Sequence, residues 1–213
     1  MNRAQTPRLV WYFDFISPYS YLQFAAHPEL VQPAELRPVL FAGLLNHWGS
    51  KGPAELPAKR LQTYRHTCWM ARRRGIAMRY PPAHPFNPIP ALRLALALDS
   101  NYAAIKAIFE FIWKEGRSVA DEWAALAARV GLTRAAADAL IAEPRVKEAL
   151  AANGRAAIAR GVYGVPTFDT GEELFWGLDA TDMLLDYLEH PDVFDDPEMQ
   201  RIARLPAGAA RKF

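Results

Sequence analysis

The first apolar run of the chain, Leu9–Phe13, is short, aromatic and β-branched, which is typical of a buried strand. Just after it, Ser17 suits the capping position of a helix, and Pro18 suits the first helical turn, where a missing N–H costs nothing. Glu35–Leu40 predicts a second strand, and Pro38 places that strand at a sheet edge or near its own end. This part of the chain therefore predicts a strand, a helix and a strand, which form one βαβ unit.

Between residues 41 and 160 the pattern changes to helices. Alanine, leucine and arginine become frequent there, and apolar residues recur at helical spacing. Helix starts are predicted at Asn87, which precedes a proline, at Ser118, and at Thr133, which precedes an alanine-rich run. This stretch predicts a block of helices.

The strand pattern returns after this block. Val165–Phe168 and Leu174–Trp176 predict two strands joined by a turn near Gly171, and Ala180–Leu188 predicts a helix after them. A βαβ unit and a ββα unit separated by helices predict an α/β fold, in which one mixed sheet is interrupted by a large all-helical insertion.

The chain of 213 residues is long enough for one large domain. We assign residues 1–40 and 161–213 to the sheet domain and residues 41–160 to a helical insertion subdomain. No apolar run approaches the roughly 20 residues that a membrane-spanning helix needs, and the polar start lacks the apolar stretch of a signal peptide. We expect a cytoplasmic protein with no membrane partner.

Charge and cysteine content exclude several function classes. The formal net charge is only +2, and the run Arg72–Arg74 before Gly75 is typical of a solvated helix end rather than a nucleic-acid surface. Because Cys68 is the only cysteine, the chain has no intramolecular disulfide, no CxxC motif and no thiolate zinc site. We expect Cys68 to serve packing, and the scattered histidines predict no metal site.

Ser17 is the first candidate for chemistry. It stands where a strand leads into a helix, at the carboxyl end of a strand, where α/β folds place ligands. The free N–H groups and the positive end of the helix dipole stabilise an anion such as a thiolate. The alternative is that Ser17 only caps its helix.

Three further places in the sequence carry a functional and a structural interpretation. If the Val165–Pro166 bond is cis, it turns the Val165 backbone outward as a template for an extended ligand, whereas a trans proline simply opens a strand. Asp179 either binds the amino group of a ligand or caps a helix. In the rigid, proline-rich loop 80–88, His84 and Asn87 contact a substrate, or else Asn87 only caps the next helix and His84 is only a solvated loop residue.

Taken together, these features resemble a known family. Three runs carry the resemblance in order along the chain, Phe13–Leu22, Gly164–Phe168 and Trp176–Asp179, and the segments Gly52–Arg60 and His84–Arg93 agree with it. The chain resembles the DsbA-like family that contains the 2-hydroxychromene-2-carboxylate isomerases and the kappa-class glutathione transferases. The resemblance covers nearly the whole chain and implies a thioredoxin-like sheet domain.

The resemblance also implies a glutathione site. Ser17 matches the serine that replaces the first cysteine of the redox motif, so it is the implied catalytic residue and hydrogen-bonds the glutathione sulfur. Ser20, in the same motif, belongs to the same site. The resemblance further implies that Pro166 is cis and that the Val165 backbone pairs with the tripeptide.

Four further positions concern the binding of glutathione. Asp179 matches the acid that holds the γ-glutamyl end, and Leu178 stands where a small polar residue commonly helps to bind it. Ser50 matches a polar residue, usually asparagine, in the loop before the long insertion helix. Ala180 stands where arginine commonly follows the acid.

The activity that the resemblance implies is a glutathione-dependent isomerisation of 2-hydroxychromene-2-carboxylate or a related intermediate of aromatic-compound degradation. The thiol adds to a conjugated carbon, the former double bond rotates, and the thiol leaves. The implied partners are a small aromatic substrate, bound near His84 and Asn87, and a second copy of the chain in a homodimer. The alternatives are a kappa-like transferase or peroxidase acting on another electrophile, and a non-catalytic thioredoxin-fold binding module.

Overall fold

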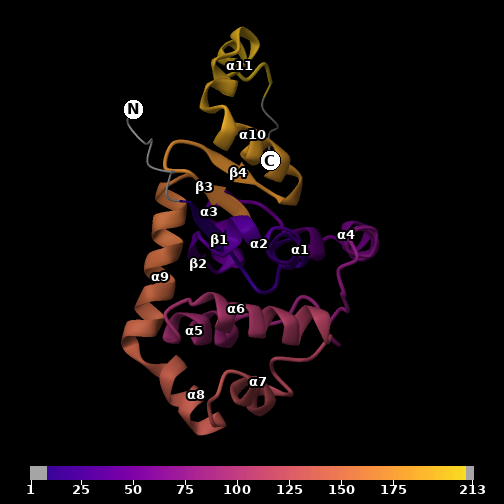
Figure 1. Cartoon of the computed structure of the whole chain (residues 1–213), viewed down its shortest axis with the longest axis vertical. Coiled ribbons are helices and arrows are strands. Elements are labelled where there is room, and N and C mark those ends of the chain that lie inside the picture. The colour runs from indigo at the N-terminus through magenta and orange to yellow at the C-terminus, as the bar shows by residue number, and fades with distance from the viewer. Residues whose placement is uncertain (1–8, 210–213) are drawn as a thin grey trace. The chain divides into compact units, whose positions relative to one another are not determined.

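The computed structural model of the protein describes residues 9–209 (Figure 1). Within this range, the residues up to Leu178 form one compact unit and those from Asp179 onward form a second. The strands are β1 (Val10–Phe13), β2 (Glu35–Pro38), β3 (Thr167–Asp169) and β4 (Leu174–Trp176). The α-helices of the first unit are α1 (Pro18–Ala26), α2 (Pro28–Val31), α3 (Phe41–Trp48), α4 (Pro57–Arg73), α5 (Ile89–Ala97), α6 (Tyr102–Phe109), α7 (Trp123–Arg129), α8 (Arg134–Ala142) and α9 (Pro144–Ala159).

The strands form one mixed sheet in the order β2-β1-β3-β4. β1 runs parallel to β2 and antiparallel to β3, and β3 and β4 form an antiparallel hairpin. Trp11 of β1 is paired with Leu36 on one side and with Phe168 on the other. The predicted βαβ and ββα order is confirmed, and so is the edge position of β2, which ends at Pro38.

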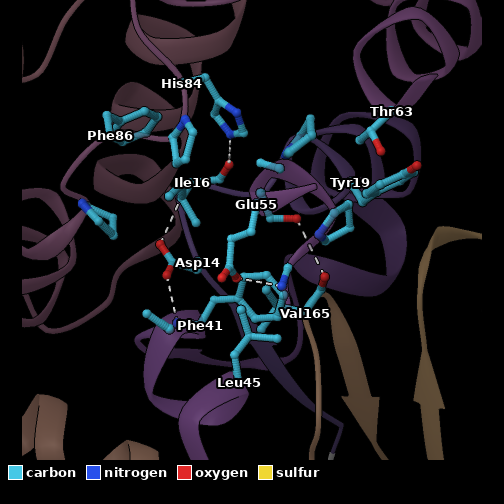
Figure 2. A pocket seen from close by; sticks show the side chains of 18 of the residues that line it. Asp14, Ile16, Tyr19, Phe41, Leu45, Glu55, Thr63, His84, Phe86 and Val165 are labelled. Carbon is cyan, nitrogen blue, oxygen red and sulfur yellow. Dashed lines mark hydrogen bonds between the residues drawn. The ribbon is translucent and has the colours of Figure 1, made fainter. Parts of the chain in front are cut away.

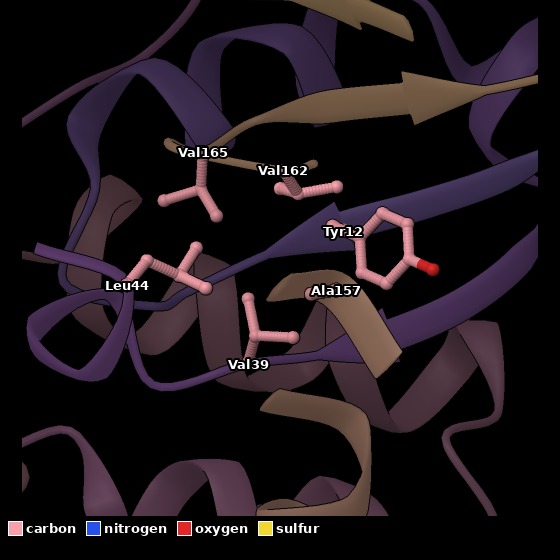
Figure 3. Close-up of a cluster of buried hydrophobic side chains, with 6 residues drawn as sticks. All are labelled: Tyr12, Val39, Leu44, Ala157, Val162 and Val165. Atoms are coloured by element: carbon pink, nitrogen blue, oxygen red, sulfur yellow. The ribbon is translucent and has the colours of Figure 1, made fainter. Parts of the chain in front are cut away.

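The side chains of β1 alternate between two buried faces because successive residues of a strand point to opposite sides. Tyr12 joins a cluster whose members come from the loop after β2, from α3, from α9 and from the segment before β3 (Figure 3). The other buried members of that cluster are Val39, Leu44, Ala157, Val162 and Val165. This cluster therefore joins the sheet to the first and last helices of the 41–160 stretch.

The opposite face of β1 carries an aromatic core. The rings of Trp11 and Phe13 stack with centroids 4.6 Å apart, and both lie near the ring of Phe109 in α6. Phe24 of α1 also lies 5.1 Å from Phe109, and all four side chains are buried. Large aromatic side chains bury much apolar area, so this core holds α1 and α6 on one side of the sheet.

The predicted block of helices is confirmed, with one wrong start. Thr133 caps α8 by accepting a hydrogen bond from the Ala136 N–H at 3.1 Å. Ser118 instead begins only a turn, and α7 starts at Trp123. The reason is Glu122, whose carboxylate binds the Ser118 N–H and whose backbone is not yet helical. The assignment of residues 41–160 to a separate subdomain stays a prediction.

Three short segments complete the first unit. They are the 3-10 turn η1 (Pro53–Glu55), the π-helical turn η2 (Glu110–Lys114), which continues α6, and the 3-10 turn η3 (Leu178–Ala180) at the boundary. Trp113 of η2 is fully buried. Its indole N–H binds the Phe15 carbonyl in the turn before α1.

The second unit contains α10 (Thr181–Glu189), η4 (Pro191–Asp195) and α11 (Pro197–Ile202). The ring of Tyr187 in α10 stacks on Phe194 at 5.5 Å, and the Asp196 carboxylate caps α11. The predicted helix after β4 is confirmed. Within residues 9–209, no helix combines the length and the apolar character that a membrane span requires.

Candidate functional site

Ser17 caps α1, as predicted. Its Oγ accepts a hydrogen bond from the Ser20 N–H at 3.2 Å, and Pro18 occupies the first helical turn. The same hydroxyl donates a long hydrogen bond, 3.5 Å, to the carbonyl oxygen of Val165. Ser17 is 6% exposed. Its hydroxyl therefore lies between the positive end of a helix and the segment that enters β3.

The Val165–Pro166 bond is cis, as predicted. On the far side of this bond, the carbonyl of Pro166 accepts a hydrogen bond from the Gly177 N–H at 2.8 Å. A glycine at position 164 lets the backbone before β3 approach the Trp176 ring closely, because a Cβ there would lie 2.3 Å from Nε1 of that ring. The loop before β3 and the end of β4 are thus packed against each other beside Ser17.

A cavity of about 410 Å³ opens at Ser17, a size typical of small-molecule sites (Figure 2). All its lining residues belong to the first unit. They are Asp14, Ile16, Ser17, Pro18, Tyr19, Leu40, Phe41, Ala42, Leu45, Gly52, Pro53, Ala54, Glu55, Thr63, His84, Pro85, Phe86, Pro88, Val165 and Trp176. The cavity therefore brings together the motif before α1, the Val165 loop and four segments of the 41–160 stretch.

Asp14 is a cavity residue that sequence reasoning did not select. Its side chain is completely buried, and its two carboxylate oxygens accept hydrogen bonds from the N–H groups of Ile16 at 3.1 Å and Phe41 at 2.8 Å. Burial raises the pKa of Asp14 to about 7, although these backbone N–H groups act in the opposite direction. The available signal was a carboxylate directly after an apolar strand and three residues before Ser17.

His84 lines the cavity, as predicted, but both its ring nitrogens are occupied. Nε2 lies 2.8 Å from the carbonyl oxygen of Ile16, so it carries the proton and donates. Nδ1 then accepts from the Tyr64 hydroxyl at 2.7 Å. Burial lowers the pKa of His84, which favours this neutral form. His84 therefore positions the turn before Ser17.

Trp113 supports the same turn from another element. Its indole N–H donates to the carbonyl of Phe15 at 2.8 Å, and its ring lies 5.6 Å from that of His84. Two ring N–H groups thus bind the consecutive carbonyls of Phe15 and Ile16. The geometry at Ser17 depends on side chains from far along the chain.

Several predicted site residues do not line this cavity. The Oδ1 of Asn87 accepts from the Ile89 N–H at 3.1 Å, so Asn87 forms a turn just before α5, and it lines a smaller pocket of about 130 Å³. Ser50 is exposed and follows α3, where its N–H donates to Leu45 O. Asp179 is exposed at the start of the second unit.

The remaining two predicted residues are buried beside α1. Leu178 packs in an apolar cluster with Leu22, Met70 and Ala71. Ser20 is completely buried one turn into α1, and its Oγ has no hydrogen-bond partner among residues 9–209.

Cys68 does not behave as expected. Its side chain is exposed on α4 rather than packed, and so is that of its neighbour Trp69. It is not a cavity residue, and partial burial raises the pKa of its thiol, which disfavours the thiolate. In the part of the chain that the structure describes, no cluster of three or more histidine, cysteine or acidic side chains is arranged to hold a metal.

Comparison with known proteins shows similarity over most of the chain. The family model described as the DSBA-like thioredoxin domain matches residues 8–189. A 2-hydroxychromene-2-carboxylate isomerase of Sphingobium xenophagum is 28% identical over 193 residues, which cover 86% of this chain and 98% of that protein. Glutathione S-transferase kappa 1 of Homo sapiens is 25% identical over 202 residues, which cover 84% and 89%.

Solved structures show the same fold. A structure of 2-hydroxychromene-2-carboxylate isomerase has a TM-score of 0.71 at 23% identity, with coverage of 93% of this chain and 99% of that one. The cytosolic disulfide reductase DsbM from Pseudomonas aeruginosa, solved with GSH, has a TM-score of 0.54 at 21% identity and covers 93% and 100%. The predicted thioredoxin-like fold with a helical insertion is confirmed.

Proposed function

The chain belongs to the DSBA-like thioredoxin family, and from that premise we propose that it is a glutathione-dependent isomerase of 2-hydroxychromene-2-carboxylate or a related intermediate of aromatic-compound degradation. Three curated relatives at 27 to 28% identity carry the name 2-hydroxychromene-2-carboxylate isomerase. The observation that carries the proposal is the position of Ser17, whose hydroxyl lies at a helix start, beside the Val165 carbonyl and at the wall of a cavity.

The residues present fit the sulfur end of glutathione. The Ser17 hydroxyl donates only a long hydrogen bond of 3.5 Å, so it can turn to a better acceptor such as a thiolate. The positive end of α1 stabilises negative charge at the same place. Three further residues predicted to bind glutathione, Ser50, Leu178 and Asp179, do not line the cavity.

When bound, glutathione supplies a nucleophilic thiol, which divides one difficult isomerisation into an addition and an elimination. The chain contributes the environment of that thiol. Ser17 and the start of α1 favour the thiolate over the thiol, as helix starts do for cysteine. His84 and Trp113 hold the backbone of the preceding turn, so the Ser17 hydroxyl keeps its direction. The mostly apolar wall gives an aromatic substrate a surface to pack against.

Ser17→Ala tests this proposal most simply. If the hydroxyl stabilises the reacting thiolate in the transition state, its loss removes a hydrogen bond worth about 1.5 to 3 kcal/mol, or roughly tenfold to a hundredfold in rate. The measurement is turnover of 2-hydroxychromene-2-carboxylate at saturating glutathione. Cys68→Ala is the matched control, because Cys68 is exposed on α4 and outside the cavity wall.

Two outcomes contradict the proposal. Full activity in Ser17→Ala together with loss of activity in Cys68→Ala would place the chemistry at the chain's own thiol. Unchanged turnover when glutathione is omitted would show that the reaction does not depend on glutathione.

A kappa-like transferase is the second candidate function, supported by the human relative. A transferase would conjugate glutathione to an electrophile and would not return the free thiol, which distinguishes it from the isomerase.

The assembly and the compartment are parts of the same proposal. We propose a homodimer, as the family resemblance implies, that acts in the cytoplasm, as the polar start of the sequence predicts. Sedimentation equilibrium of the purified chain tests the dimer, and a mass near 23.9 kDa contradicts it.

A further inference from the structure

A single residue separates the cavity at Ser17 from the smaller pocket of about 130 Å³. That pocket is lined by residues of the loop 81–87 and of the turn 117–121. Among the described residues, Phe86 is the only one that lines both spaces. Figure 2 shows its ring beside His84, at one end of the cavity. The Phe86 side chain is therefore the partition between the cavity and the smaller pocket.

The backbone that carries Phe86 is held on both sides. Before it, the ring of His84 donates to the carbonyl oxygen of Ile16 at 2.8 Å. After it, the Oδ1 of Asn87 accepts from the Ile89 N–H at 3.1 Å. The Phe86 ring itself is half-buried and lies edge-on to the His84 ring, with centroids 6.1 Å apart. The partition is therefore anchored to the same network that positions the turn before α1.

The far wall of the smaller pocket is also held by hydrogen bonds. Ser118 Oγ accepts from the Asp121 N–H at 3.1 Å, and the Glu122 carboxylate accepts from the Ser118 N–H at 3.2 Å. The guanidinium of Arg117 is paired with the same Glu122 carboxylate at 2.8 Å. The apolar lining residues are Pro81, Ala83, Phe86, Val119 and Ala120. The space behind Phe86 therefore suits an apolar group such as an aromatic ring.

We propose that Phe86 sets the size of the substrate, because its ring closes the cavity against the smaller pocket. A space of about 410 Å³ lies in the lower part of the usual range for small-molecule sites, roughly 300 to 1,000 Å³. The thiol end of glutathione takes part of this space, which leaves room for a substrate with one aromatic ring and not for a second ring fused to it. The inference rests on the proposed function for the reaction and for the aromatic carboxylate, and it adds which ring systems the site accepts.

A matched pair of ligands tests the size limit without any turnover. The trans isomers of 2-oxo-4-phenylbut-3-enoate and 2-oxo-4-(2-naphthyl)but-3-enoate share the carboxylate and the conjugated ketone and differ by one fused ring. Their dissociation constants are measured by titration calorimetry on the full chain, with excess S-methylglutathione to fill the thiol end without reacting. We expect the phenyl compound to bind at least tenfold more tightly, which corresponds to about 1.4 kcal/mol. Equal affinity, tighter binding of the naphthyl compound, or no binding of the phenyl compound up to its solubility overturns the proposal.

Phe86→Ala then removes the partition. We expect the affinity for the naphthyl compound to rise at least tenfold, because its second ring buries apolar surface in the opened space. The affinity for the phenyl compound should fall several-fold, because that compound loses its contact with the Phe86 ring. Phe86→Leu keeps a shorter apolar side chain, so it should shift the ratio of the two affinities in the same direction by less.

Phe194→Ala is the control, because Phe194 is a half-buried ring outside both spaces, and it should leave the ratio unchanged. The leucine variant keeps the test decisive if the alanine variant does not fold. A native ratio in the Phe86 variants that fold overturns the proposal.

A second substitution tests where the added ring lies. Ala120 lines the smaller pocket and is exposed, so a larger side chain can fill that pocket without disturbing the core. When Phe86→Ala is combined with Ala120→Phe, we expect the gain in affinity for the naphthyl compound to be lost. A gain that persists would place the second ring elsewhere and would overturn the role of the smaller pocket.

Turnover separates this inference from the proposed function. 2-Hydroxychromene-2-carboxylate and its benzo-fused counterpart are offered with glutathione to the native chain and to Phe86→Ala, and isomerisation is followed by absorbance. If binding follows residue 86 but neither compound is isomerised, the isomerase proposal fails and the size limit stands. If both chains isomerise both compounds equally well, the isomerase proposal stands and the size limit is wrong.

Discussion

The two walls of the cavity differ in origin and in chemistry. The sheet wall, made by Asp14, Ile16–Tyr19, Val165 and Trp176, comes from the ends of strands and the start of α1. The insertion wall comes from the helical stretch and is made by Leu40–Ala42, Leu45, Gly52–Glu55, Thr63, His84–Phe86 and Pro88. The sheet wall presents Ser17 at a positive helix end, whereas the insertion wall is apolar with one carboxylate. In the proposed reaction, the first serves the thiol and the second selects the substrate.

The comparison also shows that the sheet wall does not stand alone. The turn that precedes Ser17 is held by His84 from the insertion wall and by Trp113 from η2 behind it. Residues inserted between the strands therefore form one wall of the cavity and also hold the turn that precedes Ser17. Substitutions in each wall separate these two roles.

Trp113→Ala should destabilise the turn before Ser17 more than any other substitution proposed for the two walls. It removes the hydrogen bond to Phe15 O and a fully buried ring that packs edge-on against Tyr80 at 5.0 Å. We expect the free energy of unfolding to fall by about 3 to 5 kcal/mol, measured by chemical denaturation. Trp69→Ala is the control, because Trp69 is 57% exposed on α4, and it should cost less than about 0.5 kcal/mol.

Asp14→Asn tests the buried carboxyl that links the two walls. Burial raises the pKa of Asp14 to about 7 in the folded chain, so the unfolded chain releases this proton first as the pH rises. The contribution of Asp14 to stability is therefore present below about pH 4 and is lost as the pH rises to about 7, a change of about 4 kcal/mol.

The difference in unfolding free energy between the native chain and Asp14→Asn isolates this effect, because all other titrations cancel. The difference should move by that amount in favour of the variant between pH 4 and pH 8. A difference that stays constant with pH would show that Asp14 ionises equally easily in both states.

His84→Phe tests the support that comes from the insertion wall itself. It leaves the Ile16 carbonyl buried without its ring donor, which costs about 1 to 3 kcal/mol. Because burial lowers the pKa of His84, the native chain loses stability as the pH falls below about 6.5. The penalty of the variant should therefore shrink in acid. His66→Phe, at an exposed position of α4, should show neither effect.

Ser17→Ala has the smallest expected effect on stability and sharpens the comparison with another capped helix. Ser17 caps α1 and Thr133 caps α8 through the same kind of side-chain bond. Either alanine variant should cost about 1 kcal/mol of unfolding free energy. Only Ser17→Ala should weaken glutathione binding, measured by calorimetry. Equal affinities in Ser17→Ala and Thr133→Ala would show that Ser17 serves only as a helix cap.

The sheet wall was largely predictable because local rules govern it. Serine before proline after an apolar strand predicts a helix cap, and Ser17 has that role. The family resemblance added the cis bond at Pro166 and the proximity of Val165 to Ser17. What local rules could not give was the role of Asp14, because its partner Phe41 lies 27 residues away.

The insertion wall was less predictable because it depends on long-range packing. His84 was selected as a substrate contact, yet its ring bonds to Ile16 across 68 positions of sequence, and Trp113 reaches Phe15 across 98. Glu55 was not selected, since an exposed acid in a proline-rich turn is common. Asn87 was selected with His84, but its Oδ1 binds the Ile89 N–H just before α5, and it does not line the cavity.

A crystal structure of the chain soaked with glutathione locates the binding site of the glutathione sulfur. We expect electron density for the tripeptide along the Val165 backbone, with its sulfur within hydrogen-bond distance of Ser17 Oγ. Tripeptide density away from α1, or an empty site at millimolar glutathione, would contradict it.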